Sequence, residues 1–92
     1  MYVILVYDIS EEDNGRLVLN RVFKICKRYL THIQNSVFEG DLSKSQLIKL
    51  KYELKKNLRA DKDSVIVFKS RNSRWLDKEM WALKENQLDN FI

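Results

Sequence analysis

The stretch Tyr2-Val-Ile-Leu-Val-Tyr-Asp8, six apolar or aromatic residues followed by a carboxylate, decides the fold of this chain. An unbroken run of this kind predicts a strand that is buried on both faces and therefore central in its sheet. Ser10, with acids at positions 11–13, resembles a helix start, but Asn14-Gly15 interrupts that signal. We therefore expect the first helix to begin on one side or the other of this pair.

A helical spacing follows from Leu17. The apolar residues of one stripe are Leu19, Val22, Phe23, Cys26, Tyr29 and Leu30, and the bases that lie away from it are Arg21, Lys24, Lys27 and Arg28. This pattern predicts an amphipathic helix that runs to about Leu30. Residues 31–42 (THIQNSVFEGDL) alternate well enough for strand, as one bent strand or as two short ones.

The second half of the chain repeats the change from helix to strand. Ser43-Lys-Ser-Gln46 is a capping box, and leucines at positions 47, 50, 54 and 58 continue it at helical spacing. Residues 63–68 (DSVIVF) predict a second strongly buried strand. Residues 74–83 and 88–92 are expected to form strands of a β tail.

This order of elements predicts the fold class. Two helices between strands in so short a chain pack on one face of a single antiparallel sheet. The simplest solution is one α+β domain over residues 1–92, the ferredoxin-like βαββαβ sandwich with an extra C-terminal strand. Because the other sheet face keeps apolar residues exposed, we expect a homodimer in which the tail, about residues 74–92, packs on the partner subunit.

Composition excludes several classes of protein. The 92 residues are 45% hydrophobic and 33% charged, with no proline and two glycines, which argues against linkers and disorder. The single cysteine, Cys26, excludes an intrachain disulfide, suits a reducing cytosol and is expected to be an inert core thiol. The apolar run lacks the flanks of a secretory signal and is too short to span a bilayer. We expect a cytoplasmic protein with no membrane contact.

Charge is distributed unevenly along the chain. Residues 1–13 carry four acids and no base, residues 14–32 carry five bases and no acid, and residues 43–62 carry seven bases against two acids. Basic helices beside a separate carboxylate cluster suit a polyanion bound near a divalent cation, and a pair of solvated helix faces is the alternative.

Candidate site residues are few. The sequence has no Cys or His pair for zinc, no phosphate-binding glycine loop and no nucleophile elbow, which leaves Asp8. Asp8 is either a turn or capping aspartate or a metal ligand. A two-fold axis near the strand ends would bring two copies of Asp8 together, and a cation between them would relieve their repulsion.

Other residues have two interpretations each. His32, the single histidine, has a surface or structural role, or contacts phosphate and transfers protons. Tyr7 and Phe38 belong to the core or stack on bases. For Trp75 and Trp81 we favour packing at an interface over nucleic-acid stacking.

Three motifs resemble the CRISPR-associated Cas-two family, whose members insert new spacers into CRISPR arrays. These are Val-Tyr-Asp-Ile at 6–9, Asn-Arg-Val at 20–22 and Ile-Gln-Asn-Ser-Val-Phe-Glu-Gly-Asp-Leu at 33–42. The resemblance covers about residues 2–48 well and continues more loosely through 63–70 to the terminal Asp-Asn-Phe-Ile at 89–92. The Q-x-S-V-F-E-G stretch that follows a Y-D strand end is its specific feature.

The resemblance implies a ferredoxin-like homodimer and a metal-dependent phosphodiesterase site. Asp8 from each subunit would hold one Mg²⁺, or another divalent cation such as Mn²⁺, and act as the catalytic residue. Arg21 corresponds to a basic residue of the first helix and Phe38 to the aromatic of the second motif, while His32 stands where many members have arginine. The segment between Asp8 and Arg21 is longer than in many members, so the roles of Glu11, Glu12 and Arg16 stay open.

Three functions follow as hypotheses. The first is an endonuclease that cleaves RNA or DNA, in which Arg21, Lys24, Arg28, His32 and Phe38 contact the nucleic acid. The second is a non-catalytic dimer that bridges copies of the CRISPR integrase and supports duplex DNA on its basic helices. The third is a stand-alone ribonuclease toxin on a similar fold.

Overall fold

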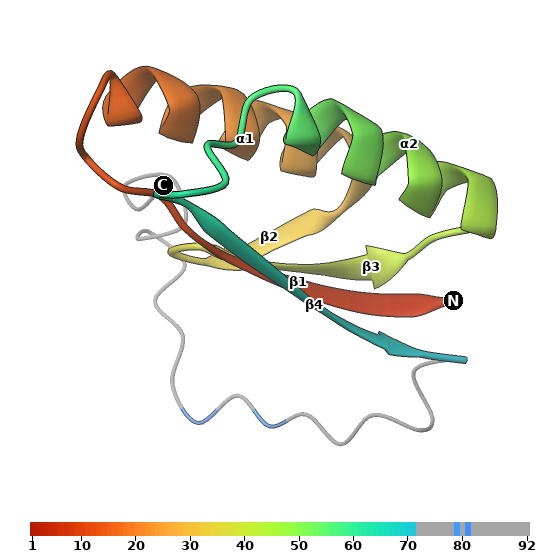
Figure 1. The fold of residues 1–92 in the computed structure, drawn as a ribbon. Coiled ribbons are helices and arrows are strands. Elements are labelled where there is room, and N and C mark those ends of the chain that lie inside the picture. The colour runs from red at the N-terminus through yellow and green to blue at the C-terminus, as the bar shows by residue number, and fades with distance from the viewer. Residues whose placement is uncertain (72–78, 80, 82–92) are drawn as a thin grey trace.

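The computed structural model describes residues 1–71, 79 and 81, and six helices and strands lie within this part of the chain (Figure 1). In chain order they are β1 (Tyr2–Asp8), α1 (Gly15–Tyr29), β2 (Thr31–Gln34), β3 (Val37–Asp41), α2 (Lys44–Lys55) and β4 (Ser64–Ser70). This is the predicted βαββαβ order. Apart from Glu79 and Trp81, the predicted tail strands, with Trp75, lie outside the described residues.

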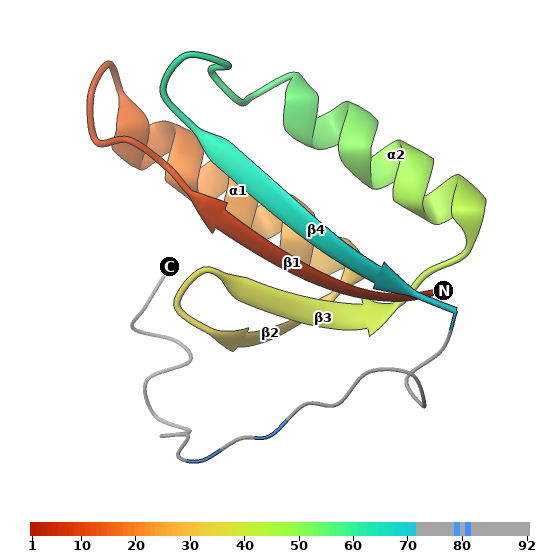
Figure 2. The same ribbon diagram turned by 60° about the horizontal axis from the view of Figure 1, so that its bottom comes forward.

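The four strands form one antiparallel sheet in the order β2-β3-β1-β4. Figure 2 shows this order, with the helices behind the sheet. The prediction that β1 is central is confirmed. Its last residue, Asp8, lies opposite Ser64, the first residue of β4.

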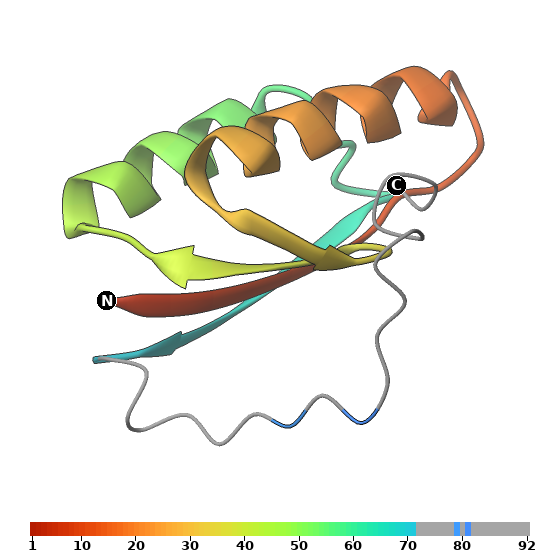
Figure 3. The ribbon, with the colours of Figure 1, turned by 180° about the vertical axis from the view of Figure 1, so that it is seen from behind.

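Both helices cover the same face of the sheet (Figures 1 and 3). Val3, Leu5 and Tyr7 of β1 are buried against them, while Ile4 and Val6, on the opposite face, remain partly exposed. The expectation that β1 is buried on both faces is therefore wrong for the single chain. The described helices cover only one side of it.

The hydrophobic core lies between the sheet and the helices. Its fully buried side chains are Phe38, Leu5, Leu50, Val3, Val22 and Cys26. Tyr7 and Phe38, for which core packing was one interpretation, are both buried. Burial raises the pKa of the Cys26 thiol to about 12, so this group is protonated and inert, as expected.

Residues 31–42 form two strands, which resolves the alternative left by the sequence. Asn35, with a φ of 41°, turns the chain between β2 and β3, and the pairing shifts between His32 and Gln34. Asparagine tolerates this left-handed backbone better than most residues.

Strand β4 differs from its prediction in burial. It forms where expected, but Ile66 and Phe68 are 55% and 57% exposed. Within the described part of the chain β4 is an edge strand, and the face that carries Ile66 and Phe68 belongs to the side of the sheet that the helices do not cover. The expectation of strong burial is thus wrong for the single chain. The accompanying expectation of exposed apolar residues on this face is confirmed.

No helix within the described part of the chain is both long enough and apolar enough to cross a membrane.

Candidate functional site

Asp8 lies at the exposed end of β1. The alternation of the strand places it on the uncovered face, together with Ile4 and Val6. No hydrogen bond or ion pair of its carboxylate is found among the described residues. Its interpretation as a helix cap is not supported, because α1 begins at Gly15, after Asn14.

The donor chemistry of Asp8 suits a magnesium ion, which prefers carboxylate oxygens. The number of donors does not suffice in one chain. Within the described residues, no group of three or more His, Cys, Asp or Glu side chains could hold a metal. Asp8 therefore fits the metal only if the remaining ligands are waters, phosphate oxygens or a carboxylate from a second copy.

Three of the predicted nucleic-acid contacts lie together on α1. Arg21, Lys24 and Arg28 are exposed and, with Lys27 and Asn57, line a shallow hollow on the helix layer. Arg28 is also tied to α2, since its Nη2 donates to Glu53 Oε1 at 2.9 Å. The hollow thus presents four cationic side chains to solvent.

The other two predicted contacts, His32 and Phe38, lie apart from these bases. Both rings pack with Phe23, and their centroids are 4.8 Å from each other. His32 is 9% exposed, and its Nε2 lies 2.8 Å from the carbonyl oxygen of Asn35. Phe38 has no exposed surface and therefore cannot stack on a base, which corrects its assignment as a nucleic-acid contact. The geometry of His32 favours its structural interpretation.

Asp8 and the basic hollow belong to opposite sides of the molecule. Asp8 is on the uncovered face of the sheet, whereas the hollow is on the helix layer. Figure 1 shows both helices on one side of the sheet. Arg16 is nearer to Asp8 in the sequence than the bases of this hollow are. It lines a second hollow with Ser10, Glu11 and Asn20, beside the segment that leaves β1.

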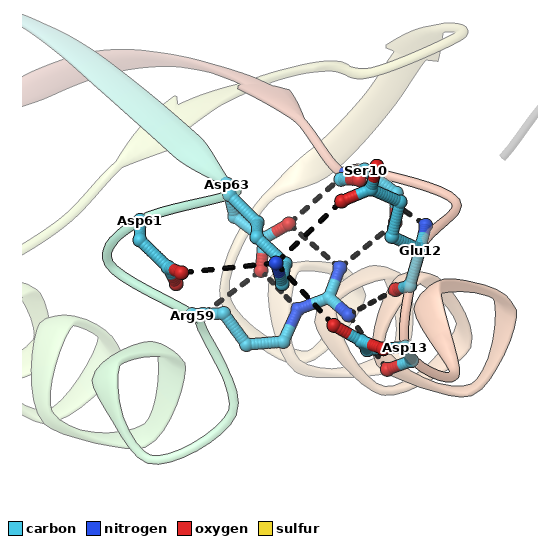
Figure 4. Close-up of polar contacts among 7 residues, drawn as sticks. Ser10, Glu12, Asp13, Arg59, Asp61 and Asp63 are labelled. Atoms are coloured by element: carbon cyan, nitrogen blue, oxygen red, sulfur yellow. Dashed lines mark hydrogen bonds and ion pairs between the residues drawn. The ribbon is translucent and has the colours of Figure 1, made fainter.

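A polar cluster that the sequence analysis missed lies beside this segment (Figure 4). Arg59 forms a salt bridge of 2.8 Å with Asp63, whose side chain has no exposed surface. Hydrogen bonds from Arg59, and further bonds from backbone N–H groups, hold the pKa of the Asp63 carboxyl well below its usual range. The one available signal was the i,i+4 spacing of the two charges, which is common in helices and says nothing about Ser10.

Lys62 lies on the outer side of the same cluster. Its Nζ is 3.5, 3.3 and 3.7 Å from carboxylate oxygens of Glu12, Asp13 and Asp61. These partners are largely exposed, so each contact contributes little. Two of the acids that follow Asp8 are thereby engaged by a lysine of the same chain.

Comparisons with known proteins agree with one another. The model of the family described as CRISPR associated protein Cas2 matches residues 1–78. A CRISPR-associated endoribonuclease Cas2 from Fusobacterium nucleatum is 56% identical over 92 residues, which are 100% of this chain and 87% of the relative. A solved structure of cas2 has a TM-score of 0.76 and 41% identity, over 92% of this chain and 91% of its own. The crystal structure of Streptococcus pyogenes Cas2 at pH 6.5 has a TM-score of 0.72 and 29% identity, over 87% of this chain and 100% of its own. From its motifs, its fold and these matches, the chain belongs to the CRISPR-associated Cas2 family.

Proposed function

We propose that this chain is a divalent-metal-dependent endonuclease of CRISPR spacer acquisition, active as a homodimer, with Asp8 as its catalytic and metal-binding residue. Its substrate is a phosphodiester of RNA or DNA. The family and the names of its relatives support the nuclease class. The observation that carries the site is the exposed carboxylate of Asp8 at the end of the central strand.

The exposed apolar face of the sheet supports the dimer. Ile66 and Phe68 expose more than half of their surface on the same side as Asp8. A second copy placed there would bury these side chains, and a two-fold axis near the strand ends would bring the two Asp8 carboxylates together. The pair would then supply two of the ligands that a magnesium ion takes from protein.

The chemistry divides between the ion and the chain. When bound, Mg²⁺ or Mn²⁺ neutralises charge on the phosphate and lowers the pKa of bound water. Asp8 holds its carboxylate at the exposed end of β1, where one side is open to a ligand. Arg16, in the neighbouring hollow, is placed to attract the nucleic-acid backbone toward this end of the strand.

Asp8→Asn tests this proposal, with Asp41→Asn as its matched control. Asp41 is also an exposed aspartate at a strand end, but it pairs with the Met1 amine at 2.8 Å. We expect Asp8→Asn to lower Mg²⁺-dependent cleavage by about 100-fold or more, in the range of lost transition-state charge stabilisation, and to leave sedimentation unchanged. Asp41→Asn should cleave like wild type. Wild-type cleavage by the purified Asp8→Asn protein would contradict the proposal.

A second candidate function is the non-catalytic adaptor. The observation that favours it is the separation of the basic hollow on the helix layer from Asp8 on the uncovered face. A duplex held on Arg21 and Lys24 would lie away from Asp8. In this case the dimer bridges copies of the CRISPR integrase and supports the DNA that is inserted.

Duplex binding measured across salt concentrations separates the two functions. Under the adaptor hypothesis, Lys24→Ala should reduce the slope of log K against log salt by about 0.9, because one phosphate contact is lost. Lys69→Ala removes the same charge from the hollow between β4 and α2, away from Arg21 and Lys24, and should leave the slope unchanged. Equal slopes for wild type and Lys24→Ala would count against the adaptor.

A further inference from the structure

The guanidinium of Arg59 connects two separate segments of the chain, residues 59–63 and residues 10–13. Its Nε and Nη2 donate to the two carboxylate oxygens of Asp63 at 2.8 and 2.9 Å. Nη2 also donates to the carbonyl oxygen of Ser10 at 2.8 Å, and Nη1 donates to the carbonyl oxygens of Asp13, at 2.8 Å, and of Glu12. One side chain from the segment after α2 therefore binds three backbone carbonyls of the β1–α1 loop (Figure 4).

Asp63 completes the connection from the other side. Its Oδ1 accepts the backbone N–H of Ser10 at 3.0 Å, and its Oδ2 accepts the backbone N–H of Arg59 at 2.8 Å. Ser10 is thus held through both its N–H and its carbonyl. A buried carboxylate with charged and neutral donors on both oxygens is a rigid anchor, since charge-assisted hydrogen bonds are short and strong.

The loop that this pair binds has an unfavourable backbone conformation. Asp13 and Asn14 have φ angles of 50° and 65°, and α1 begins directly after them. Aspartate and asparagine visit this conformation as single residues, so two of them in succession need support from the surrounding structure. Gly15 shows how tight the packing is, because a Cβ there would lie 1.9 Å from the carbonyl oxygen of Ser10.

Asp8 is next to this anchored region in two directions. Along the chain, Ile9 alone separates it from Ser10. Across the sheet it lies opposite Ser64, which directly follows Asp63. The backbone of Asp8 is therefore restrained from its own strand and from β4, and both restraints lead back to the Arg59–Asp63 pair.

We infer that the Arg59–Asp63 pair is a positioning device for the metal-binding carboxylate of Asp8. The inference rests on the proposed function of Asp8. Arg59 and Asp63 touch neither metal nor substrate. They set the path of the chain on both sides of Asp8, and so the direction in which its carboxylate meets the ion. Residues that hydrogen-bond a metal ligand directly typically change metal affinity by about 10–100-fold when they are lost, and we expect an effect in the same range for this pair, which acts through the backbone.

Mn²⁺ binding by the full chain tests the inference without relying on activity. Free Mn²⁺ is measured by electron paramagnetic resonance, at a temperature where circular dichroism shows each variant to be folded. Arg59→Lys keeps the charge but loses most of the fork of hydrogen bonds, and Asp63→Asn keeps an acceptor for Ser10 but loses the charge. We expect both variants to bind Mn²⁺ about 10–100-fold more weakly than wild type.

Arg28→Lys is the matched control. Arg28 forms an arginine–carboxylate pair of 2.9 Å with Glu53, but this pair joins α1 to α2 and has no contact with β1. Its Mn²⁺ affinity should equal that of wild type. Two differently built variants guard against one failing to fold. If both Arg59→Lys and Asp63→Asn were unfolded, the pair would serve the whole fold and the positioning role would be overturned.

Asp8→Asn separates the inference from the function on which it rests. Asp8→Asn could lose Mn²⁺ binding while the folded Arg59→Lys and Asp63→Asn variants bind Mn²⁺ like wild type. That result would overturn the positioning role alone. Wild-type Mn²⁺ binding in Asp8→Asn would overturn the metal site itself. Weakened binding in all three variants, with normal binding in Arg28→Lys, is the result that supports the inference.

Discussion

The two helices of this chain begin in different ways. At the start of α2, Ser43 Oγ accepts the N–H of Gln46 at 3.2 Å, and the Gln46 side chain accepts the N–H of Ser43 at 2.9 Å. At the start of α1, Asn14 has a left-handed backbone and forms no side-chain capping bond. The loop before it is held by Arg59, which lies 46 residues away from Asp13 in the sequence.

The difference shows that one helix start is specified by neighbouring residues and the other by residues that are distant in the sequence. The capping box needs four consecutive residues, so it forms with the helix and is visible in the sequence. The loop before α1 is held by Arg59 and Asp63, which are distant from it in the sequence, so this helix start is not visible in a short segment. The helix start that distant residues hold lies beside Asp8, where the path of the backbone matters for the proposed metal site. Three experiments test this contrast, in order of expected effect.

Arg59→Met is expected to cause the largest loss of stability. It leaves the buried carboxylate of Asp63 without its charged partner, and removal of one member of a buried pair typically costs about 3–5 kcal/mol. Because Arg59 is 18% exposed and water can reach the site, we expect about 3 kcal/mol, at the lower end. Urea unfolding measures this value. A loss no larger than that of a surface substitution would show that the start of α1 does not depend on the pair.

Acid should loosen the start of α1 before the start of α2. The pKa of Asp63 is lowered in the folded state, so its contribution to stability is complete above the ordinary value of about 4. The contribution is lost as the pH falls below that value toward the folded pKa, by about 1.4 kcal/mol for each unit of lowering.

Ser43 and Gln46 carry no titrating group, so their capping bonds should persist over the same range. Hydrogen-exchange protection of the backbone amides, corrected for the pH dependence of intrinsic exchange, measures both helix starts in one sample. Protection lost equally at Ser10 and at Gln46 between pH 5 and 2.5 would contradict this expectation.

Ser43→Ala is expected to have the smallest effect. Loss of the N-cap acceptor costs about 1 kcal/mol, and the change should stay within the first turn of α2. Thermal unfolding gives the total, and amide exchange at the first turns of both helices gives its location. Lower protection at the start of α1 would show that the two helix starts are coupled, and would contradict the claim that they are specified independently.

The same contrast explains how much of the fold was predictable. The runs and periods that mark β1, both helices and β4 are local, so each element forms within a few residues of its predicted range. Burial was less predictable, because a hydrophobic strand such as Ser64–Ser70 does not reveal whether it lies at the centre or the edge of its sheet. Phe68 was expected in the core and is 57% exposed.

The candidate site was predictable only in part. Asp8 was identified because it ends the apolar run of β1, and its exposed position agrees with a ligand role. A nucleic-acid contact of Phe38 rests on a motif resemblance alone, and the packing of Phe38 against Phe23 confirms its other interpretation, as a core residue. Arg59 and Asp63 were not identified, since their partner Ser10 lies 49 and 53 residues away along the chain.

By itself, the sequence determined the order of strands and helices, the cap of α2, the family and the choice of Asp8, because periodicity, capping and motifs are properties of short segments. Only the tertiary structure decided that Asp8 lies on the uncovered face of the sheet, that the basic hollow lies on the opposite side, and what holds the loop that follows Asp8. These relations depend on strand pairing and on contacts between distant segments, which form when the chain folds and leave no periodic signal in the order of residues.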